Sequence, residues 1–275
     1  RKIHPDWFDI DNTVFNRPAT LHPEQDSQTF TLSKRQLPNQ PPANWAITDL
    51  GQGNVQVKIS GELKAILPDH KATSVRAAGQ LPTGFKPGTL YQSRNHPRSL
   101  QMTVYSASDA ISSMGISWDQ IKNLLPPDQV AVYASNSIGQ LDDYGFGGLL
   151  KYPSIGKRTT SKQMPLGYGQ MPADFVNAYL LGNLGSTGSA LGACATFLYN
   201  LRSGVEDIRS GRRKLVVVGG SDAPITPEII EGFRAMGALA EAKGLMALDG
   251  VDALSDDALR TTSRPFANNC GFTMG

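Results

Sequence analysis

The spacing of apolar residues along the chain predicts strands in some stretches and helices in others. Apolar and polar residues alternate through NVQVKISGEL at residues 54–63, and TFTL at residues 29–32 has the composition of a strand. Residues 99–115 carry apolar side chains at helical spacing, and Gly115 is a suitable helix end. The turn-forming residues of PTGFKPG, at 82–88, separate these patterns.

From residue 129 onward, short apolar runs alternate with helical patterns. Strands are predicted at residues 129–135, 186–193 and 214–220. Helices are predicted at residues 173–185, from Cys194 to Gly211, and at 226–239 with Thr226 as N-cap. The helix after Cys194 has one apolar face, which is predicted to anchor it: Leu198, Leu201, Val205 and Ile208. This strand–helix–strand order predicts a mostly parallel α/β sheet with right-handed crossovers.

The composition changes along the chain and suggests two regions. Residues 1–44 are polar and rich in proline, and they are interpreted as an N-terminal extension that wraps around another part of the protein. Residues 45–275 are predicted to form the main domain. The chain begins with Arg1 rather than Met and stops at Gly275 within an apolar run, so both ends are interpreted as cuts.

Composition and charge exclude several classes of function. Of the 275 residues, 40% are hydrophobic and 18% charged, and the net charge is +2, which is typical of a globular protein and gives no basis for nucleic-acid binding. No apolar run approaches the roughly 20 residues that span a membrane. The two cysteines, Cys194 and Cys270, form no disulfide framework, which favours a reducing, cytoplasmic compartment.

SALGACATFLYNLRSG, residues 189–204, places Cys194 among small residues at a predicted strand-to-helix junction. A lone cysteine is commonly a small buried hydrophobe. This junction, however, is analogous to a nucleophile elbow, where a sharp turn pushes one side chain outward between small neighbours. Free N–H groups at a helix N-terminus lower the pKa of a thiol from about 8.5, and the cysteine's own N–H can hold an oxyanion. The residues therefore favour Cys194 as a nucleophile.

No general base accompanies this cysteine in the sequence. His4, His22, His70 and His96 all precede it, and their neighbours suggest loops, so we expect them to be exposed to solvent rather than catalytic. They are scattered, and none has a cysteine or carboxylate at ligand spacing, so no metal site is predicted.

Several motifs, in order, resemble the β-ketoacyl-acyl carrier protein synthases of fatty acid synthesis. They are AVYASNSIG (131–139), GNLGSTGSALGACAT (182–196), RSG (209–211), LVVVGG (215–220), GF (232–233) and SRPF…GFTMG (263–275). The resemblance extends over about residues 55–275 and is densest from 182 to 239. The long N-terminal part is similar to the longer bacterial members of the family, or to the synthase domain of multifunctional fatty acid synthases.

This resemblance implies a thiolase-like fold, in which two similar halves form α/β/α/β/α layers and this chain supplies the first half with an extension. It also implies a homodimer paired partly through residues 186–191. Cys194 matches the nucleophile that takes the acyl chain from a carrier protein as a thioester. Phe233 matches an aromatic position that lines the acyl pocket, although its place in a helix is equally typical of a core residue. Relatives often read RDGF where this chain has Asn269 and Cys270, and Cys270 is expected to serve packing.

The implied reaction is a decarboxylating Claisen condensation with malonyl-acyl carrier protein, in fatty acid or related polyketide synthesis. The family's two histidines and its lysine correspond to positions beyond Gly275. No metal or redox cofactor is implied, because the thioester and the decarboxylation supply the driving force. The basic segments Lys151–Lys162 and Arg212–Lys214 are candidates for contact with the acidic acyl carrier protein, and are equally typical of solvated surface charge.

Two alternatives stay open. One is a non-catalytic thiolase-fold subunit that shapes the pocket of an active synthase, against which the retained Cys194 argues. The other is a thiolase-type acyltransferase that condenses without decarboxylation. The residues beyond Gly275 would discriminate between these functions.

Overall fold

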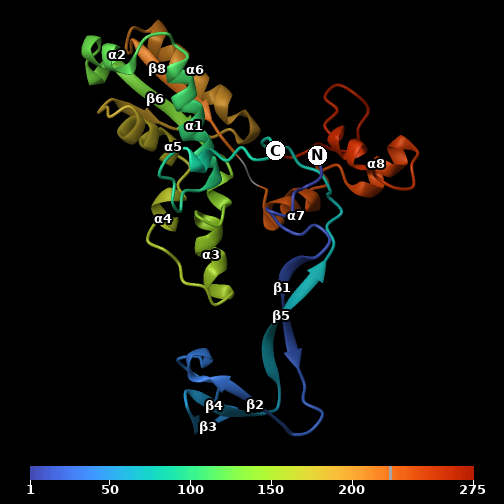
Figure 1. Cartoon of the computed structure of the whole chain (residues 1–275). Helices are drawn as coiled ribbons and strands as arrows, with labels where there is room; N and C mark the ends of the chain where they lie inside the picture. The colour runs from blue at the N-terminus through green and yellow to red at the C-terminus, as the bar shows by residue number, and fades with distance from the viewer. Residues whose placement is uncertain (223–224) are drawn as a thin grey trace. The chain divides into compact units, whose positions relative to one another are not determined.

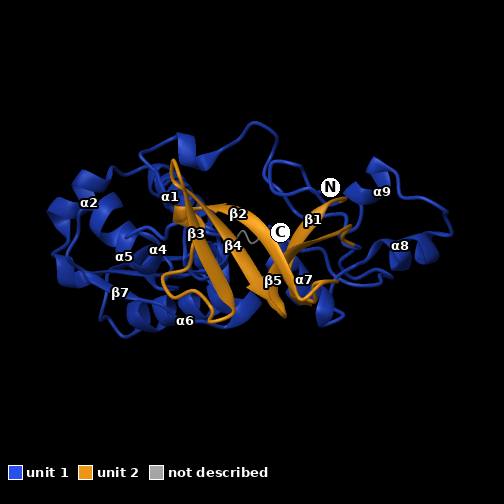
Figure 2. Ribbon diagram, turned by 90° about the horizontal axis from the view of Figure 1, so that it is seen from below, with its two compact units in different colours: residues 1–10, 74–275 blue, residues 11–73 orange. Residues whose placement is uncertain are grey.

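The computed structural model describes residues 1–222 and 225–275, and these divide into two compact units (Figure 2). Unit 1 comprises Arg1–Ile10 and Ser74–Gly275, and unit 2 comprises Asp11–Thr73. The boundary expected between residues 44 and 45 thus falls inside unit 2. The physical reason is strand pairing, because the strand that begins at Trp45 pairs with its neighbours in the same sheet.

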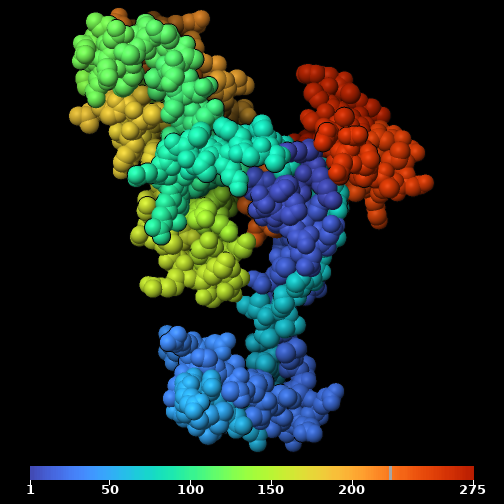
Figure 3. Space-filling view, viewed as in Figure 1, coloured from blue at the N-terminus to red at the C-terminus, as the bar shows by residue number. Residues whose placement is uncertain are grey.

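Unit 2 is built from antiparallel strands arranged as two small sheets. The strands are β1 (Thr13–Leu21), β2 (Ser27–Ser33), β3 (Trp45–Gly51), β4 (Asn54–Ser60) and β5 (Leu63–Lys71). One sheet has the order β2–β4–β3 and the other pairs β1 with β5. Alternate side chains of β4 are buried, and in the space-filling view β2, β3 and β4 form a closely packed body (Figure 3, blue, at the bottom). The strands predicted at 29–32 and 54–63 are confirmed, although Gly61, with φ +78°, separates β4 from β5.

Unit 1 contains a parallel sheet of order β7–β6–β8 that has helices on both faces (Figure 1). The strands are β6 (Val130–Ser135), β7 (Ser186–Gly188) and β8 (Leu215–Gly220). The helices are α1 (Arg98–Ser112), α2 (Trp118–Leu124), α3 (Phe146–Ser154), α4 (Gln163–Leu166), α5 (Met171–Phe175), α6 (Thr196–Arg209), α7 (Pro227–Ala235), α8 (Ala242–Asp249) and α9 (Asp256–Arg260). Short 3-10 helices lie at Lys34–Gln36, Pro87–Thr89, Pro127–Gln129, Gly139–Leu141 and Ala193–Ala195, and a π-helix at Val176–Leu180.

The predicted elements are largely confirmed, with differences at their ends. Gly115, with φ +74°, follows α1 closely, and the Thr226 side chain accepts a hydrogen bond from Ile229 N–H at the start of α7. The single helix predicted at 173–185 is instead α5 followed by a π-helix that ends at Leu180.

Helices cover both faces of β6, the central strand. Val132 points toward α1 and α5 and belongs to a buried apolar cluster with their side chains. Tyr133 and Ser135 point to the opposite face, where the Tyr133 hydroxyl donates to Asp207 and the Ser135 hydroxyl accepts from Asn200 at 2.9 Å. Asp207 and Asn200 both belong to α6. The sheet therefore lies between α6 on one face and the layer of α1 and α5 on the other.

The side of α6 that faces the sheet is not its apolar side. The residues of α6 that are buried are Thr196, Asn200, Gly204 and Asp207. The predicted anchors Leu198, Leu201, Val205 and Ile208 are 61%, 37%, 39% and 46% exposed. Gly204 permits close packing, since a Cβ there would lie 2.8 Å from Val218 Cγ1. The prediction that the leucine face anchors α6 is therefore wrong for the described chain.

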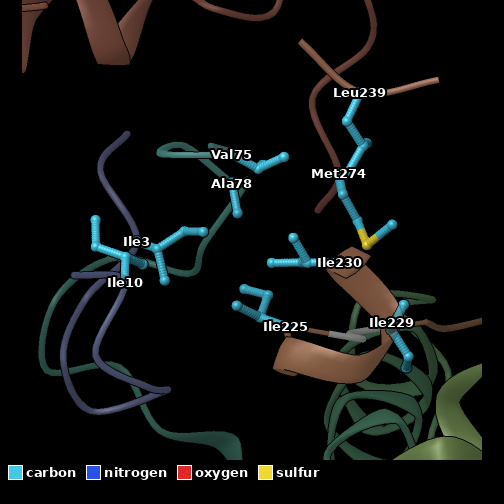
Figure 4. Packing of buried hydrophobic residues seen from close by; sticks show 9 residues of the cluster. All are labelled: Ile3, Ile10, Val75, Ala78, Ile225, Ile229, Ile230, Leu239 and Met274. Atoms are coloured by element: carbon cyan, nitrogen blue, oxygen red, sulfur yellow. The ribbon is translucent and has the colours of Figure 1, made fainter. Parts of the chain in front are cut away.

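A second apolar core joins the first residues of the chain to its last (Figure 4). Its buried members are Ile3, Ile10, Val75, Ala78, Ile225, Ile229, Ile230, Leu239 and Met274. The backbone is joined in the same region, because Gly79 N–H donates to Met274 O at 2.6 Å. Residues 1–10 thus belong to unit 1. In the part of the chain that the structure describes, no helix has the length and apolar character needed to cross a bilayer.

Candidate active site at Cys194

Cys194 lies in a tight turn between β7 and α6, and its side chain is exposed. The preceding residue, Ala193, has φ +49°, a left-handed conformation that is uncommon for a residue with a Cβ. The Thr196 hydroxyl holds this turn closed, since it accepts from Gly192 N–H at 3.1 Å and donates to Ala193 O at 2.7 Å. The structure therefore has the predicted order of strand, sharp turn and helix around the thiol.

A buried amide fixes this turn to the sheet. The Asn200 side chain, 1% exposed, accepts from Ala190 N–H at 2.9 Å and donates to Ser135 Oγ at 2.9 Å and to Gly219 O at 3.2 Å. The Ser135 hydroxyl in turn donates to Ala190 O at 2.8 Å. One side chain of α6 thus joins the segment before Cys194 to both β6 and β8.

Cys194 is one of the residues that line a cavity of about 460 Å³. The cavity is also lined by Phe233 of α7, the second residue for which the sequence predicts a role in the site. Phe197, Phe272 and Met274 are further apolar residues among those that line the cavity. Its volume lies within the range typical of small-ligand sites.

Phe272 is a lining residue that sequence reasoning did not single out. Its ring stands edge-on to that of Phe233, with centroids 5.8 Å apart and an interplanar angle of 82°. Its backbone is held on both sides, because Phe272 N–H donates to Ala238 O and Phe272 O accepts from Ala240 N–H. In the sequence, Phe272 is marked only by the GFTMG motif, which belongs to the family resemblance.

The loops that follow two neighbouring strands complete the cavity wall. Ser137 and Ile138 follow β6 one residue after its end, and Ser221 and Asp222 come directly after β8. The carboxyl ends of parallel strands are the usual place for a binding site in an α/β sheet. Asp222 was missed by sequence analysis, since a single acidic residue after a strand has no distinctive pattern.

The histidines do not reach Cys194. His4, His22 and His70 are exposed, as expected. His96 is only 8% exposed, so the expectation of a solvent-exposed loop residue is wrong. It packs edge-on against Phe175 and its Nδ1 lies 3.1 Å from the Tyr91 hydroxyl; burial and the nearby Lys162 lower its pKa.

Cys270 lies apart from the candidate nucleophile. It is exposed, and its sulfur lies so close to Gly244 that a Cβ there would be 3.0 Å away. It is not among the described residues that line the cavity. Residues 1–222 and 225–275 contain no group of three His, Cys, Asp or Glu side chains arranged to hold a metal ion.

The two basic segments differ in how freely their charges face solvent. Lys151 lies in α3 and is paired with Glu228 at 2.8 Å, whereas Lys157, Arg158 and Lys162 are exposed. In the second segment, Arg213 is held by the Ser186 hydroxyl and the Asp128 carbonyl.

The side chains of Arg212 and Lys214, on either side of Arg213, are more exposed to solvent. Arg212 pairs with Asp207 at 2.6 Å but keeps 65% of its side chain exposed, and Lys214 is exposed. Arg213 is therefore a structural residue, and the other two are available at the surface.

Comparison with known proteins places this site in a family. The sequence model described as "Beta-ketoacyl synthase, N-terminal domain" matches residues 55–275. The chain belongs to the beta-ketoacyl synthase family. The resemblance found in its sequence, to the N-terminal half of such a synthase, is thereby confirmed, and so is the thiolase-like α/β fold class that it implied.

Individual relatives agree with this family assignment. Beta-ketoacyl-[acyl-carrier-protein] synthase FabY of Pseudomonas aeruginosa is 49% identical over 275 residues, which is all of this chain and 43% of FabY. The crystal structure of ketosynthase FabY superposes with a TM-score of 0.93 over 99% of this chain and 42% of that one. A 3-oxoacyl-[acyl-carrier-protein] synthase 2 of Staphylococcus aureus is 24% identical over 185 residues, covering 67% of this chain and 41% of that protein. The chain thus spans less than half the length of these relatives.

Proposed function

We propose that this chain is the acyl-accepting part of a β-ketoacyl-acyl carrier protein synthase. The observation that carries the proposal is the position of Cys194, which is exposed in a strained turn and opens into an apolar cavity shared with Phe233. The relatives are described as beta-ketoacyl- and 3-oxoacyl-[acyl-carrier-protein] synthases, which supports an acyl group on acyl carrier protein as the substrate.

In the first half-reaction, Cys194 Sγ attacks the carbonyl carbon of an acyl-carrier thioester. The oxyanion that forms is stabilised by backbone N–H groups. Cys194 N–H is suited to this role, because no hydrogen-bond acceptor for it occurs among residues 1–222 and 225–275. A second N–H comes from outside this chain. The carrier thiolate leaves and is protonated, and the acyl chain remains on Cys194 with its apolar part in the cavity beside Phe233.

In the second half-reaction, malonyl-acyl carrier protein loses carbon dioxide, and the resulting carbanion attacks the carbonyl of the acyl-enzyme. The β-ketoacyl-carrier product departs and Cys194 is released as the thiol. Covalent catalysis thus divides one difficult step into two easier ones. Histidines from outside residues 1–275 assist the decarboxylation. No metal or redox cofactor is part of this proposal, since the thioester bond and the release of carbon dioxide supply the driving force.

The proposed partners are an acyl carrier protein and a second copy of this protein, in the cytoplasm. Carrier proteins of this class are acidic, and exposed Lys157, Arg158 and Lys162 offer them a positive surface, together with Arg212 and Lys214. Dimerisation through the edge strand β7 is supported by the sheet order β7–β6–β8, in which β7 pairs with β6 alone among the described strands. The exposed leucine face of α6 is proposed to be covered by the remainder of the synthase fold.

Product analysis tests this function directly. The intact protein, supplied with an acyl donor and malonyl-acyl carrier protein, is expected to form the β-ketoacyl product and release one carbon dioxide for each product. Residues 1–275 alone are expected to form none, because the base is absent. Product without carbon dioxide would instead indicate a thiolase-type acyltransferase. An intact protein that forms neither product nor acyl-enzyme would be a non-catalytic subunit.

A further inference from the structure

The carboxylate of Asp222 receives an unusual concentration of backbone hydrogen bonds at the wall of the Cys194 cavity. Ser137 N–H donates to both oxygens, at 3.1 Å to Oδ1 and 3.0 Å to Oδ2. Ile138 N–H donates to Oδ1 at 2.9 Å, and Gly139 N–H donates to the same oxygen at 2.7 Å. Three consecutive N–H groups of the loop after β6 therefore converge on one side chain from the turn after β8.

Such an arrangement is stable only while the acceptor is present. Consecutive N–H groups that point to one side form a concave, positive site for an anion, and hydrogen bonds to a carboxylate are stronger than those between neutral groups. Without an acceptor, these donors would lose their partners and the loop would gain freedom to change its conformation. Asp222 thus determines the conformation of residues 137–139 from a position far away in the sequence.

The loop and the turn are also fixed to the start of α1. Gly139 approaches so closely that a Cβ there would lie 2.4 Å from Ser99 Cβ. The Ser221 hydroxyl, next to Asp222, donates to Ser99 O at 2.9 Å. The loop 137–139 and the segment 221–222 therefore both contact Ser99. Together with the hydrogen bonds to Asp222, these contacts restrict the conformations that the loop can adopt.

What the loop presents to the cavity is Ile138. Ile138 is one of the residues that line the cavity, and its side chain packs against the same apolar cluster as that of Phe233. A change in the loop would displace this side chain and alter the space next to Cys194. The backbone contact made by Asp222 therefore has a consequence for the shape of the apolar cavity.

We infer that Asp222 is a positioning residue that sets the fit of the acyl chain beside Cys194 by holding Ile138 in the cavity wall. The inference deepens the proposed function and rests on it for the identity of the acyl ligand. Asp222 itself is not assigned a proton-transfer role; it acts through the loop that it binds.

Two substitutions separate the contribution of each oxygen. Asp222→Ala removes all four hydrogen bonds. Asp222→Asn keeps Oδ1, which receives three of them, and replaces the oxygen that receives the other. Asp207→Asn is the matched control, because Asp207 is 3% exposed and accepts hydrogen bonds from Tyr133 and Arg212 outside this cavity. The Asp207→Asn variant shows how far the loss of a buried carboxylate charge that packs against the same sheet, but outside the cavity, changes the reactivity of Cys194.

The experiment measures alkylation of Cys194 in the intact protein by iodoacetamide and by N-octyl iodoacetamide, with peptide mass spectrometry to resolve the two cysteines. Exposed Cys270 serves as an internal reference for probe reactivity. The readout is the ratio of the octyl rate to the iodoacetamide rate at Cys194, divided by the same ratio at Cys270. This chain-length preference reports the cavity and requires no condensation activity.

In the wild type the apolar cavity is expected to favour the octyl probe. Asp222→Ala should lower the normalised ratio by about tenfold, Asp222→Asn should give an intermediate value, and Asp207→Asn should leave it unchanged. A wild-type ratio in Asp222→Ala would overturn the inference, as would an equal fall in Asp207→Asn. If the Asp222 variants lose condensation activity but keep the wild-type alkylation ratio, the positioning role is contradicted, whereas the assignment of Cys194 as nucleophile is unaffected. A Cys194 that alkylates normally in a protein without synthase activity would instead count against the proposed function alone.

Discussion

Thr196 is the residue on which the conformation at Cys194 depends most directly. Its hydroxyl satisfies Gly192 N–H and Ala193 O inside the turn, and the residue is 4% exposed. Thr196→Val keeps the shape but leaves Gly192 N–H unpaired, while Ala193 O keeps the hydrogen bond from the backbone N–H of residue 196. The free energy of unfolding should therefore fall by about 1–3 kcal/mol, and Cys194 should alkylate at an altered rate. Thr196→Ser retains the hydroxyl and is the control.

Urea unfolding and iodoacetamide kinetics measure these two effects. If Thr196→Val and Thr196→Ser behave alike in both, the hydroxyl does not hold the turn.

At the residue scale, the sequence predicted those features that have a compositional signature. Small neighbours around Cys194 indicated a sharp turn, and the turn is present. The sequence could not reveal Asp222, because its partners are backbone N–H groups more than eighty positions away and any residue could supply them. The expectation that His96 is exposed failed for a related reason, since one of the rings that pack against it, that of Phe175, comes from a distant segment.

At the scale of elements, α6 shows how the polar side of a helix can be its buried side. Asn200 is 1% exposed and makes three hydrogen bonds, whereas Leu198 is 61% exposed. Asn200→Leu, which leaves buried partners unsatisfied, should therefore lower the stability of residues 1–275 by about 3 kcal/mol or more. Leu198→Asn should change it by less than about 1 kcal/mol.

Chemical denaturation of the two variants checks this order. Equal losses, or a larger loss for Leu198→Asn, would mean that the leucine face is the one packed on the sheet.

His96 lies just before α1, and Phe175 of α5 packs against it. Burial, followed by the charge of Lys162, holds its pKa below the ordinary value of about 6.5, so the unfolded chain binds the proton more readily than the folded one. Stability linked to His96 is thus present above about pH 6.5 and is lost as the pH falls below that value.

Calorimetry of wild type and His96→Gln at pH about 7.5 and about 5.5 measures this linkage. We expect a smaller acid-induced drop in Tm for His96→Gln, while His22→Gln, at an exposed position, behaves as wild type. An unchanged drop in His96→Gln would exclude His96 as the group responsible.

Periodicity predicted most elements because the period of a strand or helix is a local property. It did not predict which side of α6 faces the sheet, because Gly204, Asn200 and Asp207 achieve that packing through close approach and hydrogen bonds. The extent of unit 2 likewise depends on contacts between distant segments, since β1 pairs with β5 across the intervening strands.

At the scale of the whole molecule, the proposed dimer interface lies at the segment containing β7. Leu191 follows β7 and is 59% exposed in the single chain, so Leu191→Glu would place a charge in the interface. Sedimentation of the intact protein is expected to show a dimer that Leu191→Glu converts to monomer. Leu150→Glu, at a position 76% exposed on α3, is the control and should remain dimeric. A dimeric Leu191→Glu would place the interface elsewhere.

The central claim is that Cys194 carries the acyl group, and mass spectrometry of the acyl-enzyme tests it most directly. The intact protein is incubated with an acyl-acyl carrier protein, then digested, and the peptides containing Cys194 and Cys270 are analysed separately. The account predicts one acyl adduct, on the Cys194 peptide, and no adduct in Cys194→Ala, whereas Cys270→Ala acylates as wild type. An acyl adduct that persists in Cys194→Ala, or that occurs on the Cys270 peptide alone, would contradict it.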